Sequence, residues 1–97
     1  MIVVTGSIVA RADTFDRVLA LSREHVLRSR AEPGCLSHAV YRDVENPLRL
    51  VFFEEWADRK ALAKHFAVPA SGEFVTSAGA LAAEPPTLRI YEATPAS

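Results

Sequence analysis

The 97-residue sequence predicts a single α+β domain of the ferredoxin-like type, in which helices cover a four-stranded antiparallel sheet. Three observations favour this fold class. The chain has room for one hydrophobic core, some segments alternate apolar and polar residues as strands do, and others repeat apolar residues at helical spacing. In order, these segments predict strand, helix, strand, strand, helix, strand. We expect one domain over residues 1–97, with an ordered core at 2–92 and a loose tail at 93–97.

The first strand and the first helix are predicted from residues 2–10 and from about 14–30. Residues 2–10 are nearly all apolar, rich in Ile and Val, and too few for a typical helix, which favours a buried strand. Asp13 offers a carboxylate to the free N–H groups at the start of the helix. The apolar stripe of that helix consists of Phe15, Val18, Leu19, Ser22 and Val26.

A hairpin follows the first helix. Glu-Pro-Gly at 32–34 ends the helix, because proline disfavours helical geometry at the residue before it and glycine adopts turn conformations. Residues 35–43 alternate as a strand, the turn residues Glu-Asn-Pro at 45–47 reverse the chain, and residues 48–56 form the next strand. Because the connection is short, the two strands are expected to pair antiparallel.

A helical region and a last strand complete the domain. Asp58 is placed to cap a short helix that ends at Pro69, and the Ala-rich residues 71–83 predict a further helical piece. Residues 87–92 alternate again after two prolines and predict the fourth strand. One face of the short helix consists of Ala61, Leu62, His65 and Phe66.

Both faces of the predicted sheet are apolar. In a ferredoxin-like fold the helices cover one face and leave the other to water. The first strand nevertheless has Ile2, Val4 and Ile8 on one side and Val3 and Val9 on the other. An uncovered apolar patch of that extent would exceed the few hundred Å² typical of a monomer, so we expect a homodimer in which two sheets face each other.

Composition and charge disfavour several functional classes. Eleven basic against twelve acidic side chains give a formal net charge of −1, far from the basic surplus expected of a nucleic-acid-binding protein. No run approaches about 18 uncharged apolar residues, so we expect neither a membrane span nor a secretory signal. The single cysteine, Cys35, permits no internal disulfide and suits a reducing cytoplasm, where we expect the protein to reside.

The histidine spacing predicts no metal site. His25, His38 and His65 show neither the i,i+4 spacing of helical ligands nor the H-x-H spacing of strand ligands. The four glycines form neither a dinucleotide-binding nor a phosphate-binding loop. We therefore expect no metal and no bound cofactor.

Several short motifs stand in order over nearly the whole chain. They are EPGCL at 32–36, YRD at 41–43, NP at 46–47, FFEEWAD at 52–58, AL at 61–62 and His65. Together they resemble the antibiotic biosynthesis monooxygenase domain family, which implies a dimeric α+β barrel. The resemblance also implies one of several activities: cofactor-independent oxygenation of polyketide anthrones or quinols, haem degradation, or isomerisation of a phosphorylated signalling sugar. Fold alone does not choose among them.

One of these activities is disfavoured by the residues of the first strand. The resemblance implies that haem-degrading members have an Asn on the first strand, a Trp at the end of the third and a His on the second helix. Trp56 and His65 match the last two positions, but Gly6 and Ser7 stand where the Asn is expected. His25 resembles in position a His of the sugar isomerase and of some quinol-oxidising relatives.

Two histidines are the predicted catalytic residues. Oxygenation without a metal or flavin needs a dry pocket, a base that deprotonates the substrate, and a donor for the developing oxyanion. Histidine is the natural base, because its ordinary pKa lies at about 6.5. His65 shares a face with Leu62 and Phe66 and is predicted to point inward. His25 lies at the edge of the first helix's stripe, where a position on the rim is favoured.

Four further residues are candidates for substrate binding. Trp56, at the end of a strand, offers a flat wall for an aromatic molecule, with packing in the core as the alternative. Phe66 shapes the same pocket, and Tyr41 can donate to a substrate oxygen. His38 alternates with Leu36 on one face of a strand, so it lines either the pocket or the dimer interface.

Glu54 is a carboxylate in a central strand, on the same face as Phe52 and Trp56. Carboxylates are rarely buried without a partner. We expect Glu54 to form an ion pair with Arg49 or Arg89, which is favoured over a role as a catalytic acid.

The sequence thus favours a cytoplasmic homodimer that binds a planar aromatic, quinone-like or polyketide-like molecule between sheet and helices. The predicted activity is that of a cofactor-independent monooxygenase. The alternative is a non-catalytic or stress-related dimer that only sequesters such ligands, and a haem-degrading monooxygenase is less favoured.

Overall fold

Seven elements build the domain. The computed structural model describes residues 1–97. The elements are β1 (Ile2–Val9), α1 (Phe15–Ser29), β2 (Cys35–Arg42), β3 (Arg49–Trp56), α2 (Arg59–Ala67), α3 (Pro69–Ala80) and β4 (Thr87–Glu92). The predicted order of strands and helices is confirmed, and the second helical region consists of two helices with a break at Val68.

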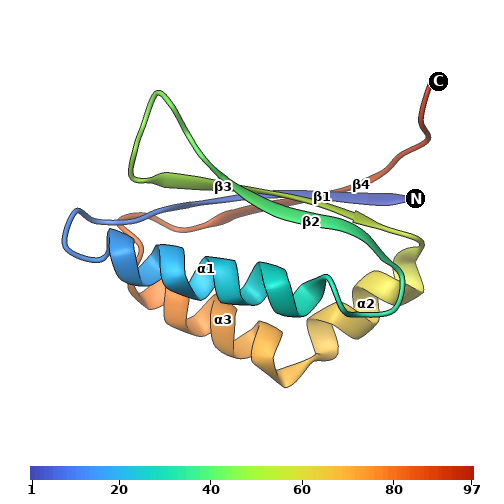
Figure 1. Ribbon diagram of the computed structural model, residues 1–97, viewed down its shortest axis with the longest axis horizontal. Coiled ribbons are helices and arrows are strands. Elements are labelled where there is room, and N and C mark those ends of the chain that lie inside the picture. The colour runs from blue at the N-terminus through green and yellow to red at the C-terminus, as the bar shows by residue number, and fades with distance from the viewer.

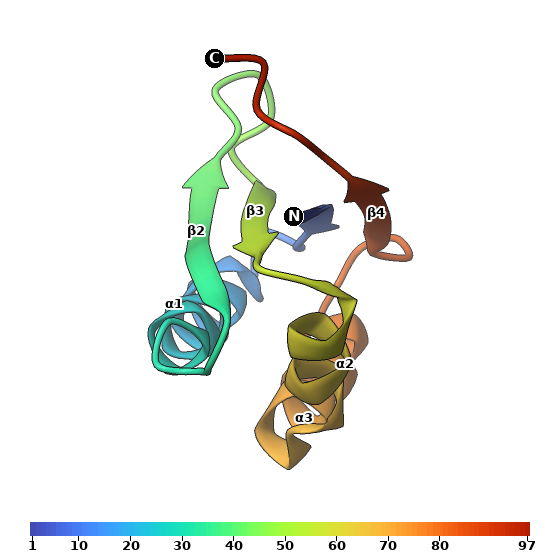
Figure 2. The same ribbon diagram turned by 90° about the vertical axis from the view of Figure 1, so that its right-hand side faces the viewer.

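The four strands form one antiparallel sheet in the order β2-β3-β1-β4. All three helices lie against one face of this sheet and leave the opposite face uncovered (Figure 1). Seen from the end, α1 lies beneath β2, whereas α2 and α3 lie together beneath the other half of the sheet (Figure 2). This arrangement confirms the ferredoxin-like α+β class, with a sheet that is open within one chain.

The start of α1 differs from the prediction. Asp13 makes no bond to the helix, and its carboxylate lies 3.5 Å from Nε of Arg11 at the surface. Thr14 occupies the N-cap position, and its hydroxyl donates to the carbonyl oxygen of Leu81 at 2.8 Å. The expected cap by Asp13 was therefore wrong. The start of α1 is held instead by a contact with the end of α3, which lies far away in the sequence.

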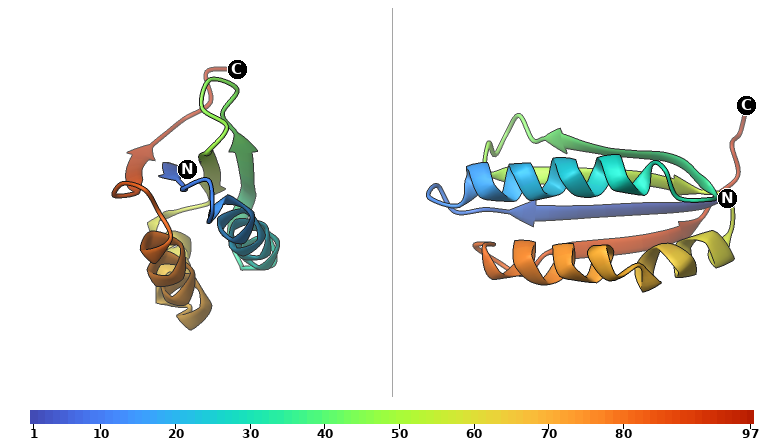
Figure 3. Two further views of the ribbon diagram at one scale, coloured as in Figure 1. Left: turned by 90° about the vertical axis from the view of Figure 1, so that its left-hand side faces the viewer. Right: turned by 60° about the horizontal axis from the view of Figure 1, so that its bottom comes forward.

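The helices α2 and α3 follow the predicted capping chemistry. The Asp58 carboxylate accepts a hydrogen bond from the N–H of Ala61 at 2.8 Å and caps α2 as expected. Val68 is extended, and Pro69 opens α3 in the first turn, where a missing N–H costs nothing. After this break α3 lies alongside α1 and runs in the opposite direction to it (Figure 3). None of the three helices combines the length and apolar character needed to cross a membrane.

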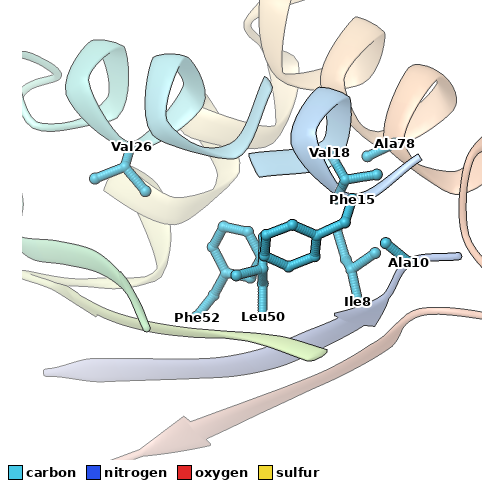
Figure 4. Packing of buried hydrophobic residues seen from close by; sticks show 8 residues of the cluster. All are labelled: Ile8, Ala10, Phe15, Val18, Val26, Leu50, Phe52 and Ala78. Carbon is cyan, nitrogen blue, oxygen red and sulfur yellow. The ribbon is translucent and has the colours of Figure 1, made fainter. Parts of the chain in front are cut away.

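Two apolar clusters fill the space between the sheet and the helices. The larger one lies between α1, α3 and the two central strands (Figure 4). It consists of Ile8, Ala10, Phe15, Val18, Val26, Leu50, Phe52 and Ala78. The smaller cluster consists of Ile2, Val4, Trp56, Ala61 and Leu62. The inward-facing residues of β1 and β3 contribute to both clusters, which explains why these two strands are so apolar.

A bulge at the start of β2 changes the predicted alternation. Cys35 pairs with Trp56 and the next pair is Ser37 with Glu55, so one residue of β2 has no partner. The extra residue is Leu36, which is 58% exposed. The expectation that Leu36 shares the face of His38 was therefore wrong, because a bulge shifts the side-chain direction by one position.

The turn at Gly34 predicts a measurable loss of stability on substitution. Gly34 has a φ of 82°, in the left-handed region, and an added Cβ would lie 2.5 Å from Cβ of Ala61. We expect Gly34→Ala to lower the free energy of unfolding by about 2 kcal/mol or more in urea denaturation. The matched control is Gly72→Ala in α3, where an added Cβ meets nothing within 4 Å. Equal effects of the two substitutions would contradict this account.

Candidate functional site

A cavity of about 400 Å³ opens between the inner face of the sheet and the helices. Its volume is typical of a small-molecule site. The aromatic and titratable side chains that line it are His25, Phe52, Glu54, His65, Phe66 and Phe74. These residues come from α1, β3, α2 and α3, so the cavity depends on the packing of all three helices against the sheet.

Three buried histidines gather beside this cavity, and two of them, His25 and His65, line it. His25 comes from α1, His38 from β2 and His65 from α2, and none is more than 5% exposed. The ring centroid of His25 lies 5.3 Å from each of the other two, and those of His38 and His65 lie 5.7 Å apart. The spacing along the chain did not reveal this cluster, because its members belong to three different elements.

A carboxylate orients His65. Oε1 of Glu32 lies 2.8 Å from Nδ1 of His65, and a carboxylate accepts, so Nδ1 carries the hydrogen. Nε2 of the same ring lies on the side of Glu54, 3.9 Å from its Oε1. The inward direction predicted for His65 is thus found. Sequence reasoning did not select Glu32 as a site residue, although it belongs to the Glu-Pro-Gly motif at 32–34.

His25 is held as a neutral imidazole. The Arg28 guanidinium donates to its Nδ1 at 3.2 Å, so the hydrogen of the neutral ring is on Nε2. Phe74 of α3 stacks on the ring with centroids 4.2 Å apart. Burial, followed by the charges of His38, His65 and Arg28, lowers the pKa of His25 to about 3. The favoured position on the rim was wrong, because α3 packs over this part of α1.

Glu54 has partners other than those expected. Nε1 of Trp56 donates to its Oε1 at 2.9 Å, and Nε2 of His38 lies 3.3 Å from the same oxygen. Burial raises the pKa of Glu54, but His38, Trp56 and His65 together outweigh burial and lower it. The expected ion pair with Arg49 was wrong, because that arginine pairs with Asp43 near the hairpin turn.

The second candidate partner of Glu54 was also wrong. Arg89 of β4 pairs in register with Thr5, and these two residues lie on the uncovered face of the sheet. Glu54 pairs in register with Val4, which is completely buried on the helix-covered face. Arg89 and Glu54 therefore lie on opposite faces of the sheet.

The four predicted binding residues lie in different places. Phe66 lines the cavity and is 47% exposed. Trp56 is completely buried behind His65, with ring centroids 4.5 Å apart, and does not line the cavity. His38 lies on the helix-covered face, which answers the question that the sequence left open. Tyr41 is 60% exposed and lies on the opposite face, away from the other candidates.

The site therefore places a proton acceptor and a proton donor beside one cavity. His65 presents Nε2 as an acceptor when the ring is neutral, because Glu32 holds the hydrogen on Nδ1. His25 has the opposite tautomer: Nδ1 accepts a hydrogen bond from Arg28, so Nε2 carries the hydrogen and is the donor. Phe66 and Phe74 add apolar surface next to both rings.

The pKa of His25 predicts how stability depends on acidity. Its ordinary value is 6.5, whereas in the folded protein it is about 3. Between these values the unfolded chain binds a proton that the folded chain does not, so stability is complete above pH 6.5 and falls as the pH is lowered towards 3. We expect His25→Gln to flatten this fall in urea denaturation measured across the range.

At the upper end of this pH range, the contribution of His25 to stability can be separated from that of Glu54. The lowered pKa of Glu54 gives a change of the same sign, but it begins only below the ordinary value of 4.5 for this carboxyl group. The change in slope between pH 6.5 and about 5 that His25→Gln produces therefore reports on His25. A slope that is the same in His25→Gln would contradict the neutral, buried state of this ring.

Comparisons with known proteins agree with the fold. The family model of antibiotic biosynthesis monooxygenases matches residues 1–77. The uncharacterized protein sll1783 of Synechocystis sp. is 40% identical to this chain over 91 residues. The match covers 94% of this chain and 62% of that protein, so the chain spans about three fifths of its relative's length.

Solved structures show the same similarity. The crystal structure of an antibiotic biosynthesis monooxygenase is similar with a TM-score of 0.90 and 34% identity, covering 98% of this chain and 100% of that one. The structure of Rv0793 from Mycobacterium tuberculosis is similar with a TM-score of 0.90 and 27% identity, covering 99% and 98%. The family model and these structures extend over most of the domain, and the chain belongs to the antibiotic biosynthesis monooxygenase family.

Proposed function

We propose that the protein is a monooxygenase that oxidises a planar aromatic, quinol or polyketide-like molecule with dioxygen and without a bound cofactor. The observation that carries this proposal is the Glu32–His65 pair, whose histidine lines a largely apolar cavity. A carboxylate that orients an imidazole prepares it to take a proton. Membership of the family supports the same class of reaction.

The reaction begins with proton transfer to Nε2 of His65. The deprotonated substrate then gives an electron to dioxygen, so the substrate itself is the reductant. For an anthrone, the CH₂ group becomes a carbonyl group. One oxygen atom enters the product, and the other leaves as water with the two hydrogens of the CH₂ group. Atoms and electrons balance without a further reductant.

Two neighbouring groups assist this step. His25 keeps a hydrogen on Nε2 and is suited to donate to the oxygen on which negative charge develops. Glu54, with Oε1 at 3.9 Å from Nε2 of His65, stabilises the imidazolium that forms. Phe66 and Phe74 offer flat apolar surfaces for a planar substrate and exclude water from the reacting atoms.

Oxygen uptake tests the proposed activity. We expect the purified protein to consume oxygen above the buffer rate when it is mixed with anthrones or hydroquinones. Replacing the base in His65→Gln should lower the rate by about 100-fold or more. No uptake above buffer, or equal uptake in His65→Gln, would overturn the proposal. Ligand-dependent quenching of Trp56 fluorescence with no turnover would indicate the non-catalytic alternative.

A matched pair of substitutions tests the role of Glu32 in that assay. Glu32→Gln should lower kcat/KM by about 10-fold or more and move the acidic limb of its pH profile to lower pH, because the imidazolium loses its partner charge. The control is Glu24→Gln, which removes an exposed carboxylate of α1. A pH profile that is the same in Glu32→Gln and the unmodified protein would contradict a positioning role.

We further propose that two chains form a homodimer through the uncovered face of the sheet. Phe53, Tyr41 and Tyr91 lie on this face and are 39%, 60% and 45% exposed. Val3 of β1 pairs with Tyr91, Val9 lies at the other end of the same strand, and both are only half-buried. Contact with a second copy would remove these apolar groups from water and close two open sheets against each other.

Sedimentation measures this assembly. At micromolar concentration we expect a mass of about 21 kDa, twice the 10.6 kDa of one chain. Phe53→Glu places a charge on the uncovered face and should give the monomer mass. Val44→Glu is the control, because Val44 is 98% exposed in the hairpin turn. A mass of 10.6 kDa for the unmodified protein would refute the dimer.

A further inference from the structure

We infer that His38, His65 and Glu54 form a binding site for one divalent transition-metal ion beside the cavity, which His65 and Glu54 line. The ligand atoms are Nε2 of the two histidines and Oε1 of the carboxylate. This site goes beyond the proposed function, and it is tested without substrate, so that the two proposals can fail separately. The histidine spacing predicted no metal, because these ligands come from β2, α2 and β3.

The distances from the Glu54 carboxylate to the two histidines suit a shared ion. Oε1 of Glu54 lies 3.3 Å from Nε2 of His38 and 3.9 Å from Nε2 of His65. Nitrogen and oxygen ligands about 2.0–2.2 Å from one ion, at angles near those of a tetrahedron, lie roughly 3.3–3.6 Å apart. The distance from Glu54 to His38 falls at the lower end of this range, and the distance from Glu54 to His65 exceeds it by a few tenths of an ångström.

His38 has free nitrogen atoms where the ion would bind. Both of its ring nitrogens are buried and have no hydrogen-bond partner. Nε2 is near Glu54, but the two groups are not aligned as a hydrogen bond. Buried polar atoms nearly always have a partner, so an unpartnered imidazole beside a carboxylate is a candidate metal ligand. A metal ion would accept the Nε2 lone pair that this geometry leaves free.

The surrounding residues supply the outer contacts that metal ligands use. Glu32 accepts the hydrogen bond from Nδ1 of His65 and directs the Nε2 lone pair towards Glu54. Trp56 donates to the Glu54 carboxylate and holds its orientation. A carboxylate or another polar group behind each ligand is the usual arrangement in metal sites. The two carboxylates also offset the charge of a divalent ion.

His25 is assigned a place beside the ion and outside the ligand set. One of its nitrogens lies within 4.8 Å of nitrogens of the other two rings. However, Arg28 donates to Nδ1, so Nε2 carries a hydrogen and has no free lone pair. His25 is therefore suited to hydrogen-bond to a water molecule or an anion on the ion, in a coordination position that the three protein ligands leave open.

Ligand chemistry identifies the class of ion. Two imidazoles and one carboxylate favour zinc, copper, nickel or iron over magnesium and calcium, which prefer oxygen ligands. His65 and Glu54 line the cavity, so the ion can be reached from it. A bound ion would occupy the lone pair of His65 that takes a proton in the proposed reaction. A bound ion and the proton of the substrate therefore compete for Nε2 of His65.

Calorimetric titration with ZnCl₂ tests the site directly. The protein must be untagged and dialysed against EDTA, because a polyhistidine tag binds the same ions. We expect one Zn²⁺ per chain, and visible absorption bands typical of four-coordinate Co²⁺ when CoCl₂ is added instead. Absence of binding at micromolar protein concentration in both titrations would overturn the proposal.

Substitutions identify the ligands. We expect His38→Gln and Glu54→Gln to weaken Zn²⁺ binding by about 10-fold or more, and His25→Gln to weaken it less. The control is Cys35→Ser, because the one free thiol of the chain is an alternative zinc ligand. Full binding in His38→Gln, or loss of binding in Cys35→Ser, would overturn the assignment.

A measurement on the unmodified protein tests the ligands without any substitution that could prevent folding. In ¹⁵N NMR spectra, Zn²⁺ should shift the Nε2 resonances of His38 and His65. Unchanged Nε2 resonances at saturating Zn²⁺ would overturn the site. Where oxygen uptake is observed, Zn²⁺ should inhibit it and EDTA should restore it, and full uptake by the loaded protein would contradict His65 as a ligand.

Discussion

The turn that follows α1 controls the site, because it brings a carboxylate to a buried histidine. Gly34 takes the left-handed conformation against Ala61 of α2, and its carbonyl oxygen accepts a hydrogen bond from the N–H of Ala57 at 2.8 Å. The same turn places Glu32 at 2.8 Å from Nδ1 of His65. One tight turn thus fixes α1, β2 and the start of α2 relative to one another and orients the histidine beside the cavity.

The polar groups gathered there are tolerated because they stabilise one another. Burial disfavours charge, and it is the first cause of the lowered pKa of His25, which stays neutral between Arg28 and Phe74. Glu54 remains ionised because His38 and Trp56 compensate for its burial. The resulting cluster combines one neutral ring with two rings that face carboxylates, so three histidines occupy a small volume between the sheet and the helices.

Local patterns predicted the elements well and the contacts of several side chains poorly. The inward direction of His65 follows from its position on one face of α2. Asp13 does not cap α1, because the start of that helix is held by the distant residue Leu81. His25 is covered by α3, and Glu54 meets a histidine of another strand in place of an arginine. The failures at Asp13 and His25 involve partners far away in the sequence, whereas Glu54 meets His38 on the neighbouring strand and Trp56 on its own strand.

Hydrophobic periodicity, capping residues and turns are properties of neighbouring residues. The order of strands and helices, the α+β class and the family motifs can therefore be read from the chain alone. Contacts between elements depend on register and on helix packing. The pairing of β2 with β3 places His38 opposite Glu54, and α3 packs beside α1, where Phe74 stacks on His25. The histidine cluster exists because long-range packing brings α1, β2 and α2 together. The spacing of the three histidines along the chain does not reveal it.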